Sequence, residues 1–127
     1  VEAMERLILP RLREFQPDII IIACGFDASA IDPLARMLAT SETFGQLTKF
    51  VMGAANELCS DRLAMVHEAG YAEVYVPFCG HRVIQELSSS SIKADDPYKF
   101  LFESWQPNQR IQNFYSELIT ELEQFFF

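Results

Sequence analysis

The sequence predicts an α/β protein, in which helices alternate with parallel strands. The run DIIIIAC, residues 18–24, is continuously apolar and β-branched, which is typical of a strand covered on both faces of a parallel sheet. A second short apolar run, Leu63–Glu68, follows after a long helical segment. A crossover of this length between two strands predicts parallel pairing with a right-handed connection.

The helices are predicted from apolar residues at helical spacing. The first covers residues 4–15, where Pro10 should kink or divide it. The second follows an irregular segment, residues 25–41, and the third runs from Val76 to Leu87 with Pro77 in its first turn. The apolar face of the second helix consists of Phe44, Leu47, Val51, Ala55 and Leu58.

The remaining segment reads as a surface loop, residues 88–96, and a tail helix, residues 107–127. We expect the apolar side of the tail helix to face inward; it contains Ile111, Phe114, Leu118, Leu122 and Phe125. Two strands make a poor sheet, because each keeps an unpaired edge. The chain therefore needs more sheet than it encodes.

Composition narrows the class of protein. Half of the 127 residues are apolar, enough for the core of one domain. A net charge of −8 without a basic run argues against direct binding to nucleic acid. The longest apolar run, Ile19–Cys24, is far shorter than the roughly 20 residues that cross a bilayer. The sequence has three cysteines without CxxC spacing, which predicts free thiols in the core: Cys24, Cys59 and Cys79. Free thiols are typical of a reducing compartment, so we expect a cytoplasmic protein. We expect no membrane partner.

Two polar side chains follow the predicted strands. Ligands of open α/β sheets bind outside the carboxyl ends of the strands. Asp27 lies three residues past Cys24, and Tyr71 lies three residues past Glu68, so parallel strands would bring both to the same end. A carboxylate and a phenol there could hold a metal or polarise a carbonyl. The simpler interpretation is that Asp27 caps a turn and Tyr71 packs with a hydrogen-bonded hydroxyl.

Other residues are weaker candidates for a functional site. His67 and His81 have no second His or Cys at ligand spacing, so both read as structural. Asp32, before Pro33, reads as a turn-forming or helix-capping residue. Glycines such as Gly25 form no phosphate-binding motif.

The segments GFDASAIDPLARMLATSETF and MVHEAGYAEVYVPFCGHRVI, with the lead-in LPRLREFQPDIIIIA, resemble the zinc-dependent histone deacetylase superfamily. The resemblance is to its bacterial class II-like and acetylpolyamine amidohydrolase branch. It implies an arginase-like parallel sheet sandwiched by helices, of which this chain would be the C-terminal part. Residues 1–127 would then belong to one catalytic domain, with a motif-bearing part, residues 1–87, and a loop and tail helix, residues 88–127.

The resemblance also implies roles for individual residues. Asp27 maps onto a zinc ligand, and Tyr71 maps onto the tyrosine that stabilises the developing oxyanion. Leu34 and Gly70 would line the channel for acetyl-lysine or acetylpolyamine. Ala69 stands where the family usually has glycine, so we expect its methyl group to narrow the channel or disturb the turn that presents Tyr71.

The family's other two zinc ligands and its paired catalytic histidines have no counterpart here, and His67 and His81 do not match them. We therefore expect the isolated chain to be inactive without a missing N-terminal portion or a homo-oligomeric partner. One alternative is a non-catalytic remnant that oligomerises through its exposed strands and its tail, Phe125–Phe127. A weaker alternative is an α/β regulator that uses Asp27 as a phosphoacceptor.

Overall fold

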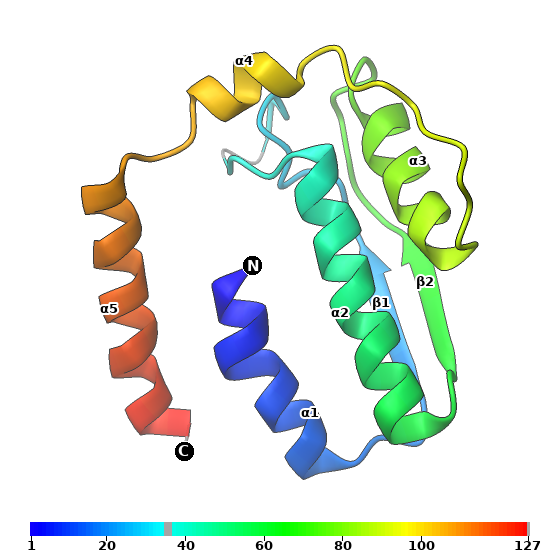
Figure 1. The fold of residues 1–127 in the computed structure, drawn as a ribbon, viewed down its shortest axis with the longest axis vertical. Coiled ribbons are helices and arrows are strands. Elements are labelled where there is room, and N and C mark those ends of the chain that lie inside the picture. The colour runs from blue at the N-terminus through cyan, green and yellow to red at the C-terminus, as the bar shows by residue number, and fades with distance from the viewer. Residues whose placement is uncertain (35–36, 127) are drawn as a thin grey trace.

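The computed structural model describes residues 1–34 and 37–126 and is a mixed α/β structure (Figure 1). A short π-helical turn, η1, precedes the first α-helix. Helix α2 lies between the two strands in the chain, and three further helices follow β2. The elements in chain order are η1 (Met4–Ile8), α1 (Leu9–Phe15), β1 (Ile20–Cys24), α2 (Ser41–Cys59), β2 (Leu63–His67), α3 (Val76–Leu87), α4 (Lys99–Ser104) and α5 (Gln109–Phe126).

The two strands pair in parallel, as predicted. Their register runs from Ile20 opposite Leu63 to Cys24 opposite His67. Helix α2 is the crossover between them and packs against both strands and against α3 (Figure 1). The helical segment before β1 runs without a break to Phe15, and its pattern changes from π-helix to α-helix between Ile8 and Leu9, just before Pro10.

Only one face of the sheet is covered by the described residues, which corrects the expectation that the strand at 18–24 is covered on both faces. Ile20 is buried against α1 and α2, whereas Ile21 is 65% exposed and Val66 on β2 is 53% exposed. The cause is topological, because α1, α2 and α3 all pack on the same side of this sheet.

The core consists of two clusters on that covered side. One lies where α1 and α2 meet β1; its buried residues are Leu9, Ile20, Ala54, Ala55 and Cys59. The other lies between the strand ends, α2, α3 and α4; its buried residues are Phe26, Phe44, Ala72, Tyr75, Cys79, Val83 and Phe102. Burial of Cys59 and Cys79 confirms that they are core residues, and burial raises the pKa of the Cys79 thiol to about 12.

Helix α4 was not predicted. It is a short helix of six residues that follows the expected loop, and its Phe102 is completely buried. The Phe102 ring meets the ring of Tyr75 edge-on, with centroids 4.8 Å apart. A single buried aromatic therefore seats this helix on the second core cluster.

Helix α5 forms where it was expected, but the prediction that its apolar side faces inward is wrong. The predicted inward residues are all exposed: Ile111, Phe114, Leu118, Leu122 and Phe125. The partly buried residues of α5 are Ser116, Ile119 and Glu123, two of which are polar, and the helix contacts η1. Phe127, the end of the predicted aromatic tail, lies outside the described residues.

An arginine on η1 explains this orientation of α5. The Arg6 guanidinium donates to both carboxylate oxygens of Glu123, at 2.8 and 2.6 Å, and to the Thr120 hydroxyl at 2.7 Å. It also pairs with Glu2 at 2.6 Å. The hydrogen bond from Arg6 holds the pKa of Glu123 below its ordinary value. Helix α5 is thus docked by charge, and its apolar side is left facing outward.

None of the helices in the described ranges combines the length and the apolar character that crossing a bilayer requires.

Candidate active site at the carboxyl ends of the strands

The loops that follow β1 and β2 are joined directly beyond the sheet. The Glu68 N–H group donates to the Cys24 carbonyl at 3.2 Å, and the Phe26 N–H group donates to the Ala69 carbonyl at 2.5 Å. These bonds continue the parallel pairing past the last paired residues. The segments that carry Asp27 and Tyr71 therefore lie next to each other at the carboxyl end of the sheet, as the spacing predicts.

Asp27 is partly buried in a turn after β1. A Cβ atom built on Gly25 would lie 2.9 Å from Asp27 Oδ1, 3.4 Å from the Ala69 nitrogen and 3.5 Å from Ala69 Cβ. The missing side chain at Gly25 thus leaves room for both the carboxylate and the Ala69 methyl group. The Ala69 carbonyl accepts the bond from Phe26 next to this position, and the expected effect of the Ala69 methyl group on the channel or the turn stays a prediction.

Gly70 is a tight packing position immediately before Tyr71. Its φ angle is +143°, a conformation that residues with a side chain rarely adopt. A Cβ atom there would lie 2.9 Å from Phe26 Cβ and 2.9 Å from Val76 Cγ2. The Tyr71 side chain that follows is 53% exposed, and Leu34 on the neighbouring loop is 71% exposed, so both are available at the surface.

Asp32 links the two loops. The residue is 6% exposed, its Oδ1 accepts the Leu34 N–H group at 2.9 Å, and its Oδ2 accepts the Tyr71 N–H group at 2.7 Å. The bond to Leu34 confirms the turn-forming role that the sequence predicts. The bond to Tyr71 was missed, although a turn of this kind uses only one oxygen of a carboxylate and leaves the other for a second donor.

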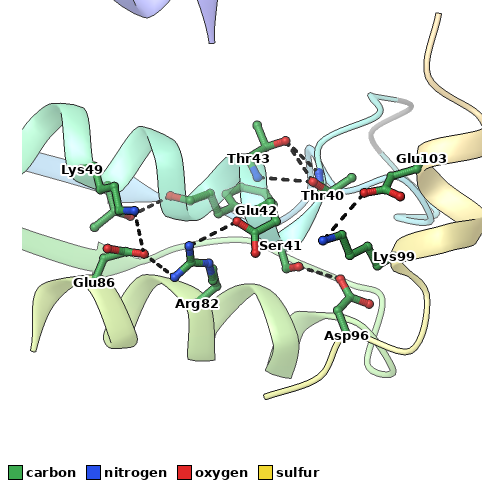
Figure 2. Close-up of polar contacts among 12 residues, drawn as sticks. Thr40, Ser41, Glu42, Thr43, Lys49, Arg82, Glu86, Asp96, Lys99 and Glu103 are labelled. Atoms are coloured by element: carbon green, nitrogen blue, oxygen red, sulfur yellow. Dashed lines mark hydrogen bonds and ion pairs between the residues drawn. The ribbon is translucent and has the colours of Figure 1, made fainter. Parts of the chain in front are cut away.

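A buried polar network holds the chain just past this loop. The Tyr75 hydroxyl accepts the Ser41 N–H group at 2.8 Å and donates to Asp96 Oδ2 at 2.8 Å. Ser41 Oγ donates to the same Asp96 oxygen at 2.6 Å, a bond drawn in Figure 2. Burial, and then the Asp96 carboxylate, raise the pKa of Tyr75, so the hydroxyl keeps its proton.

A further cavity lies away from the strand ends. It has a volume of about 450 Å³ and lies between α2, α3 and residues 93–99. Charged side chains line it: Arg82 pairs with Glu42 at 3.2 Å and with Glu86, and Lys49 pairs with Glu86 at 3.5 Å (Figure 2). These ion pairs join α2 to α3, and neither Asp27 nor Tyr71 is among the residues that line this cavity.

A metal at the strand ends would need more ligands than this part of the chain supplies. In residues 1–34 and 37–126, no three His, Cys, Asp or Glu side chains are grouped so that they could hold a metal ion. His67 packs its ring against Phe26 with centroids 5.2 Å apart, which agrees with a structural role. The chemistry of the Asp27 carboxylate suits one oxygen ligand of a metal site, and a complete site would need other ligands beside it.

The chain is a parallel α/β unit with a carboxylate and a phenol on adjoining loops at its strand ends, the edge where ligands bind in open α/β proteins. The family is identified by comparison with known proteins. The family model described as the histone deacetylase domain matches residues 1–87. The chain belongs to the histone deacetylase family.

Two curated relatives show the extent of the similarity. The histone deacetylase-like amidohydrolase of Pseudomonas aeruginosa is 45% identical over 122 residues, covering 96% of this chain and 32% of that protein. Histone deacetylase 8 of Arabidopsis thaliana is 35% identical over 96 residues, covering 76% of this chain and 24% of that protein. The chain therefore spans a third or less of the length of these relatives.

Solved structures agree on the fold. The HDA15 HD domain superposes with a TM-score of 0.62 at 28% identity, covering 75% of this chain and 26% of that chain. The histone deacetylase Clr3 superposes with a TM-score of 0.67 over 99% of this chain and 19% of its own, and at 22% identity this likeness concerns the fold alone.

Proposed function

We propose that this chain is part of a zinc-dependent amidohydrolase that removes acetyl groups from acetyl-lysine or acetylpolyamines. The family and the 45% identical amidohydrolase support the type of reaction. The observation that carries the proposal is the hydrogen bond from Phe26 to Ala69, which joins the two loops that bear Asp27 and Tyr71. A metal-dependent hydrolytic site needs a metal ligand and a hydrogen-bond donor close to each other.

Asp27 would supply one carboxylate ligand, and the remaining ligands would lie outside these 127 residues. A bound zinc ion supplies Lewis acidity toward a carbonyl and toward a water molecule. The Tyr71 hydroxyl would donate a hydrogen bond to the acetyl oxygen, and this bond strengthens as negative charge develops there. Leu34 and Gly70 would line the entrance for the acylated amine.

The test uses the protein as its gene encodes it, with fluorogenic acetyl-lysine and with acetylated spermidine as substrates. Tyr71→Phe should lower kcat by about 100- to 1000-fold, because it removes one oxyanion donor. Tyr115→Phe is the matched control, because it removes the same hydroxyl group from a tyrosine that is 52% exposed on α5, away from the site. Full activity in Tyr71→Phe would refute the role given to this tyrosine.

Metal content tests the ligand separately. We expect Asp27→Asn to lower the zinc content of the purified protein, and we expect residues 1–127 alone to be inactive and to bind zinc weakly. Stoichiometric, tightly held zinc in residues 1–127 alone would contradict the proposed division of ligands. The ratio of activity on the two substrates assigns the substrate class.

A second candidate is a non-catalytic, oligomerising module of the same family. It is favoured by the exposed sheet face at Ile21 and Val66 and by the outward apolar side of α5. Sedimentation of the encoded protein decides its assembly state. A stable homo-oligomer that binds zinc yet hydrolyses neither substrate would favour this candidate over the enzyme.

A further inference from the structure

We propose that Asp32 is a positioning residue, which holds the backbone at Tyr71 and at Leu34 so that the phenol stands at a fixed place beside the Asp27 loop. The inference rests on the proposed function of Tyr71. Asp32 itself needs no contact with substrate, since both of the bonds that carry the inference go to backbone N–H groups.

The burial of Asp32 indicates a specific role for its charge. A carboxylate that is 6% exposed loses most of its hydration, and this loss is tolerated only when hydrogen bonds replace the water. The two bonds, at 2.9 and 2.7 Å, have the short lengths of charge-assisted hydrogen bonds. One is local, two residues ahead, whereas the other joins residues that are 39 apart in the chain.

Tyr71 lies between two other anchor points. On one side, the Ala69 carbonyl accepts the bond from Phe26 at 2.5 Å, and on the other, the Ala72 carbonyl accepts the Tyr75 N–H group at 2.8 Å. The hydrogen bond from the Tyr71 N–H group to Asp32 holds the backbone at Tyr71 itself. Removing it leaves the loop attached at both ends, so the fold should persist while the phenol loses its fixed position.

Loss of position affects catalysis more than binding. A displacement of about 1 Å at a catalytic group can lower the rate by about 100-fold. We expect Asp32→Ala to lower kcat by about this factor while KM changes far less. Asp32→Asn keeps one acceptor oxygen, so it should restore part of kcat relative to Asp32→Ala.

Asp96 offers a matched control. It is a partly buried carboxylate that also accepts the N–H group two residues ahead, from Tyr98 at 2.8 Å. Its other bonds in the described ranges come from the Ser41 and Tyr75 hydroxyls, and none comes from the Tyr71 backbone. Asp96→Ala should lower stability without the selective loss of kcat. Amide hydrogen exchange of the encoded protein supplies a readout that does not depend on activity, because Asp32→Ala should speed exchange at Tyr71 and Leu34 and Asp96→Ala should not.

The double variant decides between positioning and general damage. If Asp32 acts through the phenol, Asp32→Ala adds little further loss of kcat in a Tyr71→Phe background. Multiplicative losses, unchanged exchange at Tyr71, or the same selective loss of kcat in Asp96→Ala would each overturn the inference. If Asp32→Ala does not fold, Asp32→Asn takes its place in the same cycle.

Failure of the proposed function has a different signature. Full activity in Tyr71→Phe would refute the role of the tyrosine, and a loss of kcat in Asp32→Ala would then also refute positioning through it. Exchange at the Tyr71 amide still tests the anchor in that case, since protection that does not depend on Asp32 would overturn it.

Discussion

Replacing Tyr75 with phenylalanine removes one oxygen atom from the centre of the second core cluster. The side chain is completely buried, and its ring contacts with Phe102 and Tyr98 should persist. The hydroxyl connects the first amide of α2, at Ser41, with the Asp96 carboxylate before α4. The substitution therefore tests how much this polar network contributes to the free energy of unfolding.

The magnitude follows from what each partner has left. Asp96 Oδ2 keeps the bond from Ser41 Oγ at 2.6 Å, so the carboxylate retains a donor. The Ser41 N–H group loses its acceptor within a residue that is only 5% exposed. An unsatisfied buried donor costs about 1 to 3 kcal/mol, and a hydrogen bond to a charged group contributes about 1.5 to 3 kcal/mol. We expect Tyr75→Phe to lower the free energy of unfolding by about 2 to 4 kcal/mol.

Urea unfolding of the encoded protein, followed by circular dichroism, measures this difference. Tyr98→Phe is the control, because Tyr98 lies in the same aromatic cluster and its hydroxyl makes no hydrogen bond within the described ranges. A loss below about 0.5 kcal/mol in Tyr75→Phe, or equal losses in the two variants, would refute the reasoning.

Three further predictions concern other parts of the fold. Because burial raises the pKa of Cys79 to about 12, the folded protein should not react at this thiol with iodoacetamide at pH 8, and unfolding in urea should expose it. Gly70→Ala should lower the free energy of unfolding by about 1 to 3 kcal/mol in urea titrations, because φ is +143° and Cβ would meet neighbouring side chains. The pKa of Glu123 lies below its ordinary 4.5, so its contact with Arg6 should be complete above pH 4.5 and should be lost as the pH falls through the lowered pKa. Nuclear magnetic resonance of the α5 amides can follow this transition.

Each of these predictions has a contradicting result. Labelling of Cys79 at the same rate before and after unfolding would show that the thiol is accessible. A Gly70→Ala protein as stable as the parent would show that the loop relaxes around the added carbon. For α5, Glu123→Gln should abolish most of the acid transition, and an unchanged transition would place its origin elsewhere.

Local patterns predicted the strands, the longer helices and the meeting of the two loops, because each depends on periodicity or on strand direction alone. Helix α4 escaped prediction, since six residues are too few to show a helical period and its place is decided by one buried ring, Phe102. The period of α5 identified its apolar side but not what that side faces. Its orientation depends on Arg6, more than 100 residues earlier in the chain.

The candidate site was predictable to a similar degree. The nearness of the segments that bear Asp27 and Tyr71 was predicted from the distance of each residue to its strand end, which is a local property of each segment. The second bond of Asp32 joins two loops, so it depends on the parallel register and on the tight backbone at Gly70 together. No single stretch of sequence contains that information.

The parallel register of β1 and β2 has a consequence for insertions and deletions. The two strands end opposite each other, with Cys24 paired to His67, and the site segments 25–27 and 68–71 follow directly. One residue added to either segment would therefore shift its side chains by about 3.3 Å and turn them to the opposite side. The turn at residues 60–62 connects α2 to the opposite end of the sheet. In sequences related to this one, changes of length should therefore gather near 60–62 and avoid both segments at the site.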